Sequence, residues 1–487
     1  MLTTLDAQYE PPGRKYFSET AVPKLYEQLR GEIVNELKEA NFIALTTDMW
    51  SSINMSSYMS ITAHYVSKDW TLKSKCLETA FTPESHTAAV LAEALHDGLQ
   101  AWGIGEEKVV CITSDNGANI VAAVRDLKWP WISCFGHNLN LAVNNALNKE
   151  KNKTDRAFGV CRQINGAFSH SWQRRQQLRK EQEQQGIKKP LSLITDCATR
   201  WGSKYAMTER THTLLPHIRR VFADDRSRRT LPTISWQDVS VLEAVTEGLK
   251  SVSEFTDILS SERDVTISSL LPLLHLIKDT LKEKESDAKL TAAIKQTILE
   301  QLDSRNDNDK IIQLMRTAAL LDPRYKATHM GSIDLDYIRT QLEDEMVLFW
   351  KQTTSGPPVT VRDSTDDDDA PPFSQSQPSK KKKTLGSLLG TIRPASVATP
   401  EQQAQAEMAN YLQEEVVDGE TNALEWWKRN ESHLPLMAKI AQKYLCIPAT
   451  STPSERIFSK AGNVVTRYRS LLKPDKVNML VFLSNNL

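Results

Sequence analysis

Residues 42–50 read FIALTTDMW, and this stretch decides how the first part of the chain is interpreted. Its first four residues form a short apolar run of the kind found in central strands. Residues 58–66 then carry apolar side chains at every second position, which is the period of a half-buried strand. Residues 70–81 predict a third strand. The segment therefore begins with a meander of three strands.

Helical spacing surrounds this meander. Residues 20–39 before it and 86–102 after it place apolar residues on one helical stripe. The remaining elements are a strand at 108–113, a helix opening near Asp115, a strand at 131–134 and a helix from about 137 to 150. Three strands followed by alternating helices and strands is the order that ribonuclease H-like folds use. The sequence therefore predicts an α/β fold with a ribonuclease H-like core.

Beyond residue 150 the sequence predicts helices only, so a large all-α insertion is expected to interrupt the core. Residues 353–404 combine prolines with runs of four Asp and four Lys, a composition that buries too little apolar surface to fold. The expected domains are a lead-in helix at 1–40, the first part of the core at 41–150, the helical insertion at 151–352, a disordered linker at 353–404 and a C-terminal helical region at 405–487 that completes the core.

The composition indicates a protein of the cytosol or nucleus. The 487 residues include 60 Lys+Arg against 61 Asp+Glu, so a polyanionic partner has to bind local basic patches. Six scattered cysteines predict a reducing compartment and no disulfide framework. The polar N-terminus has no signal-peptide pattern, and no run approaches the roughly 18 apolar residues of a membrane span. No membrane partner is expected.

Two aspartates mark a candidate metal site in the strand-rich segment. Asp48 is expected at the end of the first strand and Asp115 just after the fourth. If those strands are neighbours, the carboxylates converge, and paired hard oxygen ligands suit the Mg²⁺ ions that promote phosphodiester cleavage. The alternative is structural, because Asp115 suits a helix cap or a turn and Asp48 suits a strand end.

Six ordered blocks resemble the hAT-superfamily transposases. They are TTDMWSS at 46–52, SDNGAN at 114–119, CFGHNLNL at 134–141, TRW at 199–201, LDPRYK at 321–326 and a C-terminal run from Leu445 to Ser470 that resembles the hAT dimerisation region. The chain looks similar to the zinc-finger BED domain-containing proteins, which are host proteins derived from such transposases. The N-terminal BED finger of those proteins has no counterpart in the sequence, so no zinc finger is expected in this chain.

The resemblance implies a ribonuclease H-like catalytic core whose third acidic residue follows the helical insertion. Asp48 and Asp115 match the two aspartates of the family, and Glu455 matches its glutamate. The implied catalytic and metal-binding residues are therefore these three, with Mg²⁺ or Mn²⁺ as the cofactor. A structural alternative stands for Glu455, because residues 452–455, TPSE, form a capping-box sequence with Thr452 at the cap.

Two further pairs match family blocks. For Arg200 and Trp201, the resemblance implies that the tryptophan stacks on a flipped base, an interaction worth roughly 1–3 kcal/mol. The alternative is a tryptophan buried in the core. Cys134 and His137 lie at metal-compatible spacing, but no second Cys/His pair follows at finger distance. A structural role at the strand-to-helix junction is therefore favoured over zinc binding.

Residues 149–189 form the most basic segment, with eleven cations against four carboxylates and thus a local excess of seven positive charges. Such a segment suits a phosphate backbone, and the alternative is a solvated helix face. Its candidate DNA-binding residues are Arg174, Arg175, Arg179 and Lys180. The lysines at 380–383 are a candidate nuclear-import signal or a solvating charge run.

The expected function is that of a nuclear, hAT transposase-like DNA-binding protein that forms a homodimer or higher homo-oligomer through its C-terminal region. A metal-dependent site for DNA strand cleavage and transfer is part of this expectation. The alternative is a domesticated, non-catalytic transcriptional regulator in which the fold serves as a dimerising scaffold. The apolar periodicity of residues 434–487 motivates self-association, and packing of these helices on the core is the alternative.

Overall fold

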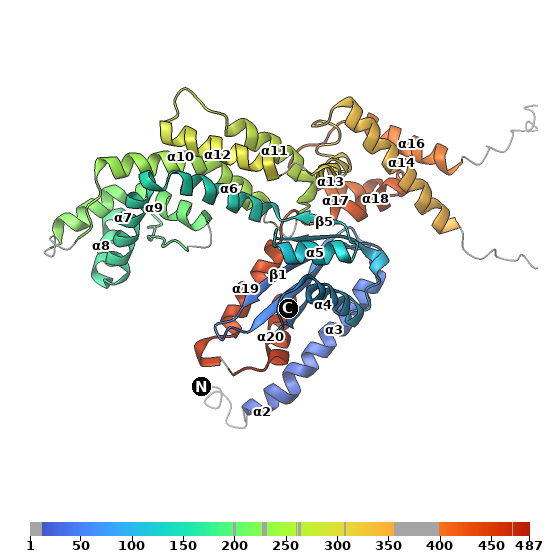
Figure 1. Cartoon of the computed structure of the whole chain (residues 1–487), viewed down its shortest axis with the longest axis horizontal. Helices are drawn as coiled ribbons and strands as arrows, with labels where there is room; N and C mark the ends of the chain where they lie inside the picture. Colours follow the sequence, from blue (N-terminus) through green and yellow to red (C-terminus); the bar gives the residue numbers. More distant parts are fainter. Residues whose placement is uncertain are drawn as a thin grey trace, which may run out of the picture. The chain divides into compact units, whose positions relative to one another are not determined.

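The computed structural model describes residues 12–197, 201–225, 231–259, 261, 264–305, 308–354, 399–469 and 471–487. The chain divides into two compact units. The first comprises Met1–His329, Val417–Lys428 and Ala441–Leu487, and the second comprises Met330–Val416 and Arg429–Ile440. Figure 1 shows that the only sheet among the described residues belongs to the first unit, together with the C-terminal helices.

The sheet has five strands in the order β3-β2-β1-β4-β5. The strands are β1 Ile43–Ser51, β2 Ser57–Val66, β3 Leu72–Phe81, β4 Val109–Ser114 and β5 Trp131–Ser133. The first three pair antiparallel, whereas β4 pairs parallel with both β1 and β5. The predicted meander and the alternating part that follows it are therefore confirmed, as is the α/β class.

The first strand is longer than its apolar run suggested. β1 continues to Ser51, because Asp48 pairs with Ser60 and Trp50 with Tyr58 along the antiparallel ladder with β2. The expectation that Asp48 ends the first strand is therefore wrong. The backbone groups around Asp48 are hydrogen-bonded within the sheet, which fixes the position of its carboxylate more firmly than a loop does.

One face of the sheet is covered by α3 Val22–Glu39, α4 Ala88–Ala101 and α5 Ala118–Asp126. The short elements α2 Arg14–Tyr16 and η1 Phe17–Ala21 precede α3, and η2 Glu106–Lys108 precedes β4. Leu45 and Ile61 on the sheet pack with Leu95 of α4 in a single apolar core. Burying each such side chain contributes about 1.5–3 kcal/mol, so this face holds much of the stability of the core.

The C-terminal helices cover the other face and one edge. They are α19 Thr452–Val464 and α20 Pro474–Asn486, preceded by the short η4 Arg467–Arg469. Phe458 and Val481 pack with Tyr58 of β2. Asn478 accepts a hydrogen bond from the Thr79 N–H of edge strand β3 at 2.9 Å. Because these helices bury their apolar faces against the sheet, the C-terminal segment completes the core, as the prediction for 405–487 states.

The middle of the chain is helical, as predicted. Its helices are α6 Phe135–Lys149, α7 Lys151–Ser169, α8 Trp172–Gln184, α9 Trp201–Asp224, α10 Trp236–Leu259, α11 Ile267–Thr280, α12 Lys289–Arg305 and α13 Asp309–Leu320. Phe168, Leu178 and Leu214 join α7, α8 and α9 in one apolar cluster. No described helix of the chain is long and apolar enough to cross a membrane.

The second unit contains the helices that border the predicted linker. α14 Ser332–Thr354 and α16 Pro400–Gln413 extend into the range 353–404 at its two ends, and residues 355–398 lie outside the described residues. The linker boundaries were therefore too wide, because Thr399 and Gln402 form a capping box that starts α16. α17 Ala423–Asn430 and α18 Pro435–Leu445 complete the helices.

Candidate functional site

The register of two parallel strands places Asp48 and Asp115 side by side. Thr46 of β1 pairs with Thr113 of β4. Each aspartate lies two residues beyond its threonine, so the two residues are level with each other on the same face of the sheet, with Asp48 inside β1 and Asp115 just past the end of β4. This is the convergence that the sequence predicted, and both aspartates are half-buried.

The third carboxylate comes from α19, which is hydrogen-bonded to the same face of the sheet. The Ser454 hydroxyl lies 2.7 Å from the Thr46 hydroxyl, although 408 residues separate them. The Thr113 hydroxyl donates to the Pro448 carbonyl at 2.8 Å. These contacts hold the start of α19 against β1 and β4. Glu455 follows Ser454 in the first helical turn and is half-buried.

The capping-box interpretation of Glu455 is wrong. α19 begins at Thr452, its N-cap is Ser451, and no side chain makes a cap hydrogen bond. The cap lies one residue earlier than predicted, and the Ser451 N–H donates to the Cys134 sulfur at 3.2 Å. The carboxylate of Glu455 is therefore not used to cap the helix.

We call Asp48, Asp115 and Glu455 the acidic corner, because their charges influence one another. Burial, together with the negative charges of Glu455 and Asp115, raises the pKa of Asp48 to about 7, although a hydrogen bond from the Met49 N–H lowers it. That bond measures 2.8 Å. A carboxyl in such surroundings holds its proton near neutral pH when no cation is present.

Asp115 also has a local role. Its Oδ1 accepts the Gly117 N–H at 3.1 Å, so the turn interpretation is confirmed. The helix that follows, α5, has Gly117 as its N-cap, and Asp115 does not cap it. The turn uses one carboxylate oxygen of Asp115 and fixes the direction of the side chain.

The three carboxylates of the acidic corner are not arranged as a metal-coordinating group in this structure. Among the described residues, no group of three or more His, Cys, Asp and Glu side chains is arranged to hold a metal ion. The donor chemistry of the acidic corner nevertheless fits a hard divalent cation, because all three groups are carboxylates. Burial and, to a smaller extent, the charges of Glu455 and Asp115 disfavour the ionised form of Asp48, and a bound cation would favour it.

Behind the acidic corner runs a chain of buried polar groups that sequence reasoning missed. The Ser454 hydroxyl contacts Thr46, Thr46 contacts the Thr62 hydroxyl, and Thr62 lies 2.9 Å from His64 Nε2. Burial lowers the pKa of His64 to about 3, so its ring stays neutral and available for hydrogen bonding. The signal in the sequence was polar residues at alternate positions of β1 and β2, facing away from the apolar core.

Cys134 has the structural role that was predicted for it. It is the N-cap of α6, and its sulfur accepts the His137 N–H at 3.4 Å as well as the Ser451 N–H. Burial raises the pKa of this thiol. It links the strand-to-helix junction after β5 to the start of α19, close to the acidic corner.

Trp201 is buried, with 4% of its surface exposed, and its backbone N–H donates to Asn140 Oδ1 at 3.4 Å. In this conformation the indole belongs to the helical core and does not present a face for base stacking. Arg200 lies outside the described residues. Base stacking by this pair stays a prediction.

The fold neutralises part of the basic segment at 149–189. Six of its eleven cations form ion pairs, among them Arg174 with Asp225 at 2.8 Å and Arg179 with Glu183 at 2.8 Å. Three of the acidic partners, Asp196, Asp225 and Asp238, lie outside the segment. Counting them reduces the local excess from seven positive charges to four. Arg175 and Lys180 remain exposed on α8.

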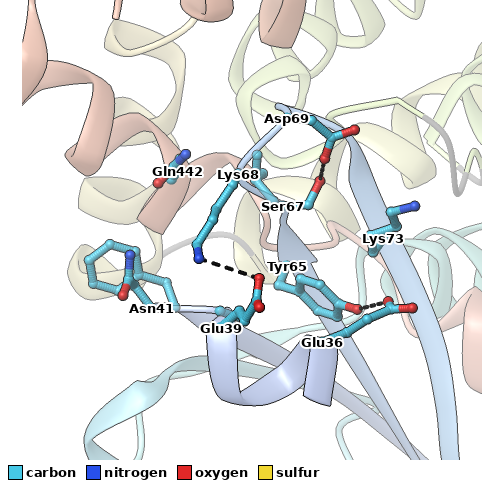
Figure 2. Close-up of a pocket in the computed structure, with 12 residues that line it drawn as sticks. Glu36, Glu39, Asn41, Tyr65, Ser67, Lys68, Asp69, Lys73 and Gln442 are labelled. Carbon is cyan, nitrogen blue, oxygen red and sulfur yellow. Dashed lines mark hydrogen bonds and ion pairs between the residues drawn. The ribbon is translucent and has the colours of Figure 1, made fainter. Parts of the chain in front are cut away.

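A cavity of about 230 Å³ lies near the start of β1, away from the acidic corner (Figure 2). Its wall mixes carboxylates and lysines: Lys68 lies 3.3 Å from Glu39, and the Tyr65 hydroxyl donates to Glu36. Because both signs of charge line it, this cavity shows no preference for one ligand class.

The LDPRYK block also has a structural role. Asp322 is fully buried and accepts hydrogen bonds from Ser268 at 2.6 Å and from the Arg324 guanidinium at 2.7 Å. Trp427 of α17 is buried too and donates its indole N–H to the Leu321 carbonyl at 2.9 Å. These contacts join α11 and α17 to the end of α13.

Three family models match separate parts of the chain, and the first two adjoin each other. The ZBED1 RNase-like domain matches residues 46–131, the ZBED1 RNase-like helical domain matches 132–247, and the hAT family C-terminal dimerisation region matches 407–487. Asp48 and Asp115 lie in the first match and Glu455 lies in the last. The two regions that the fold brings together at the acidic corner are therefore those two matched domains.

Curated relatives match along nearly the whole chain. Human zinc finger BED domain-containing protein 4 is 23% identical over 100% of this chain and 41% of its own length. The putative AC transposase of maize is 22% identical over 96% of this chain and 59% of its own length. The putative transcriptional regulator tpeD of Talaromyces stipitatus is 22% identical over 94% and 55%. The chain thus spans about half the length of these relatives.

Proposed function

The chain belongs with the hAT transposases and the zinc-finger BED proteins related to them. We propose that it binds DNA and cleaves DNA strands at the acidic corner. One observation carries this proposal. Glu455, some 340 residues after Asp115, lies close enough to raise the pKa of Asp48 together with Asp115. Such a concentration of carboxylates in a half-buried position suits a divalent cation.

Asp48, Asp115 and Glu455 would hold Mg²⁺ or Mn²⁺, and the cation would draw the three carboxylates together. When bound, it supplies activation of a water and stabilisation of the departing oxygen. The residues of the chain position this site. Thr46 and Ser454 hold α19 on the sheet, the Asp115 turn fixes its carboxylate, and the ladder of β1 fixes Asp48.

A nicking assay tests the proposal. The full chain is incubated with hairpin and duplex DNA in the presence of Mn²⁺, and the variants Asp48→Asn and Glu455→Gln are compared with the control Asp97→Asn, which changes an exposed carboxylate of α4. We expect cleavage by the wild type and by the control, and loss of cleavage in both site variants. Equal activity of the wild type and Asp48→Asn would rule out catalysis at the acidic corner.

The second candidate function is a non-catalytic DNA-binding regulator. Two observations favour it: Trp201 is buried, and the described residues contain no closed metal-ligand group. Calorimetry with Mn²⁺ separates the two candidates. Binding that disappears with Asp115→Asn supports the cleavage site, whereas no heat of binding to the wild type supports the regulator.

DNA binding is proposed to use the cations of 149–189 that have no ion pair among the described residues. These are Lys149, Arg175, Lys180, Lys188 and Lys189. Each phosphate contact contributes about −0.9 to the slope of log K against log[salt] for a duplex. Five contacts therefore predict a slope of roughly −4.5, and a slope near zero would contradict this assignment.

Self-association is proposed because residues 407–487 match the hAT dimerisation region. The apolar stripes of α19 and α20 do not supply the interface, because they are buried against the sheet. Leu471, which is 97% exposed, is a candidate contact.

Light scattering on the full chain should give twice its mass of 55.0 kDa. Leu471→Glu should lower that mass, and the control Leu276→Glu in α11 should not; a monomeric wild type would contradict the proposal.

A nuclear location is also proposed, because DNA cleavage or regulation requires access to chromatin. The lysines at 380–383 are the candidate import signal and lie outside the described residues. A fluorescent fusion should lose nuclear accumulation when these four lysines are replaced by alanine, and unchanged accumulation would contradict their role.

A further inference from the structure

A cleft of about 680 Å³ lies in the helical region between α7, α8 and the segment that follows α8. Phe168 and Leu178 are buried residues of its wall, and both belong to the apolar cluster of α7, α8 and α9. We call it the Trp172 cleft, after the indole on its wall. None of the residues of the acidic corner lines it.

The charge of the cleft is uniform. Its lining includes three cations, Arg175, Arg179 and Lys189, and no carboxylate. Arg179 forms an exposed pair with Glu183, while Arg175 and Lys189 have no ion pair among the described residues. Exposed pairs contribute only about 0–1 kcal/mol, so Arg179 is readily available to another anion. The cleft therefore favours an anionic ligand, whereas the cavity in Figure 2 is lined by both carboxylates and lysines.

The aromatic group of the cleft is unusually open. Trp172 is the first residue of α8 and has 66% of its surface exposed. Its backbone is fixed by Ser171, whose side chain caps the helix by accepting the Arg174 N–H at 3.3 Å. Arg175 and Gln176 follow it by one helical turn, so the indole and a guanidinium lie on the same side of the helix.

We propose that the Trp172 cleft binds single-stranded DNA, with Trp172 stacking on an unpaired base and with Arg175 and Lys189 contacting the neighbouring phosphates. An aromatic platform beside cations is the arrangement that recognises unpaired strands, because a base in a duplex has both faces covered by its neighbours. This inference rests on the proposed DNA-binding function and adds an unpaired strand to the duplex that the cations of 149–189 are proposed to bind.

Fluorescence anisotropy with the full chain tests this inference. Three labelled probes are used: a 15-nucleotide thymidine strand, an abasic strand of the same length and a duplex. The variant is Trp172→Ala, and the matched control is Trp236→Ala, which removes another tryptophan that is 74% exposed but lies outside the cleft. We expect Trp172→Ala to weaken binding of the thymidine strand about 5- to 100-fold and to leave the abasic strand and the duplex nearly unchanged. Trp236→Ala should change none of the three.

A second variant tests the phosphate contacts. Arg175→Gln should weaken binding of the thymidine and abasic strands alike and reduce the salt slope of single-strand binding by about 0.7. Equal affinity of the wild type for the thymidine and abasic strands, with duplex binding intact, would overturn the stacking role and leave the proposed function standing. Failure of the wild type to bind any of the three probes would overturn both.

Discussion

Replacing Asp48 by asparagine should stabilise the folded protein above neutral pH. Burial, Glu455 and Asp115 together raise the pKa of Asp48 from 3.8 to about 7. A carboxyl whose pKa is raised by folding contributes stability that is fully present below the unfolded pKa and is lost as the pH rises through the folded pKa. At about 1.36 kcal/mol per pKa unit, the ionised Asp48 costs roughly 4 kcal/mol at pH 8. Asparagine carries no charge and avoids this cost.

Denaturant unfolding of the two proteins between pH 5 and pH 8, without divalent cations, measures the effect. The stability advantage of Asp48→Asn should grow by about 2.5 kcal/mol over this range. The Met49 N–H keeps an acceptor, because asparagine retains one side-chain oxygen. The control Asp97→Asn should show a difference that does not vary with pH.

Adding Mn²⁺ should reduce the advantage of Asp48→Asn at pH 8, because a bound cation stabilises the ionised wild-type carboxylate. An advantage that is constant between pH 5 and pH 8 would refute the reasoning. It would mean that Asp48 does not lie in the half-buried, negatively charged surroundings described above.

Three further substitutions test the surroundings of the site. Ser454→Ala should lower the free energy of unfolding by about 1 kcal/mol, because it removes the hydrogen bond to Thr46. It should also weaken Mn²⁺ binding measured by calorimetry, and unaltered Mn²⁺ binding would contradict a positioning role for Ser454. Asp322→Ala should destabilise by about 3–5 kcal/mol in denaturant unfolding, because it leaves Arg324 buried without its carboxylate, and a loss below 1 kcal/mol would contradict this. Trp427→Phe should cost about 1–3 kcal/mol through the lost indole hydrogen bond, with no effect on Mn²⁺ affinity.

Local patterns in the sequence were sufficient to predict the order of strands and helices along the core. The alternation in β2 and the helical stripe in α4 each reflect burial on one face, because the spacing of apolar residues follows the face that is buried. The position of Asp48 within β1 was missed, because the strand continues past its apolar run into polar residues. The polar face of β1 lies against the C-terminal helices. No local pattern in the sequence shows that these helices pack on the sheet.

Contacts between distant segments account for the other differences. The N-cap of α19 is Ser451, whose N–H donates to the Cys134 sulfur across 317 residues. The basic segment is partly neutralised by acidic residues such as Asp238, which lie outside it in the sequence. The apolar stripes of α19 and α20 predicted a surface for self-association, whereas they cover the sheet. An apolar stripe shows that one side of a helix is buried, but it does not show whether the sheet or a second copy of the chain covers it.

The meeting of Asp48, Asp115 and Glu455 around one cation is tested most directly by anomalous diffraction from crystals of the full chain soaked in Mn²⁺. The account predicts an anomalous peak coordinated by carboxylate oxygens from all three residues, and loss of that peak in Glu455→Gln crystals. A crystal structure without a peak between these carboxylates, or with Glu455 directed away from Asp48, would contradict it.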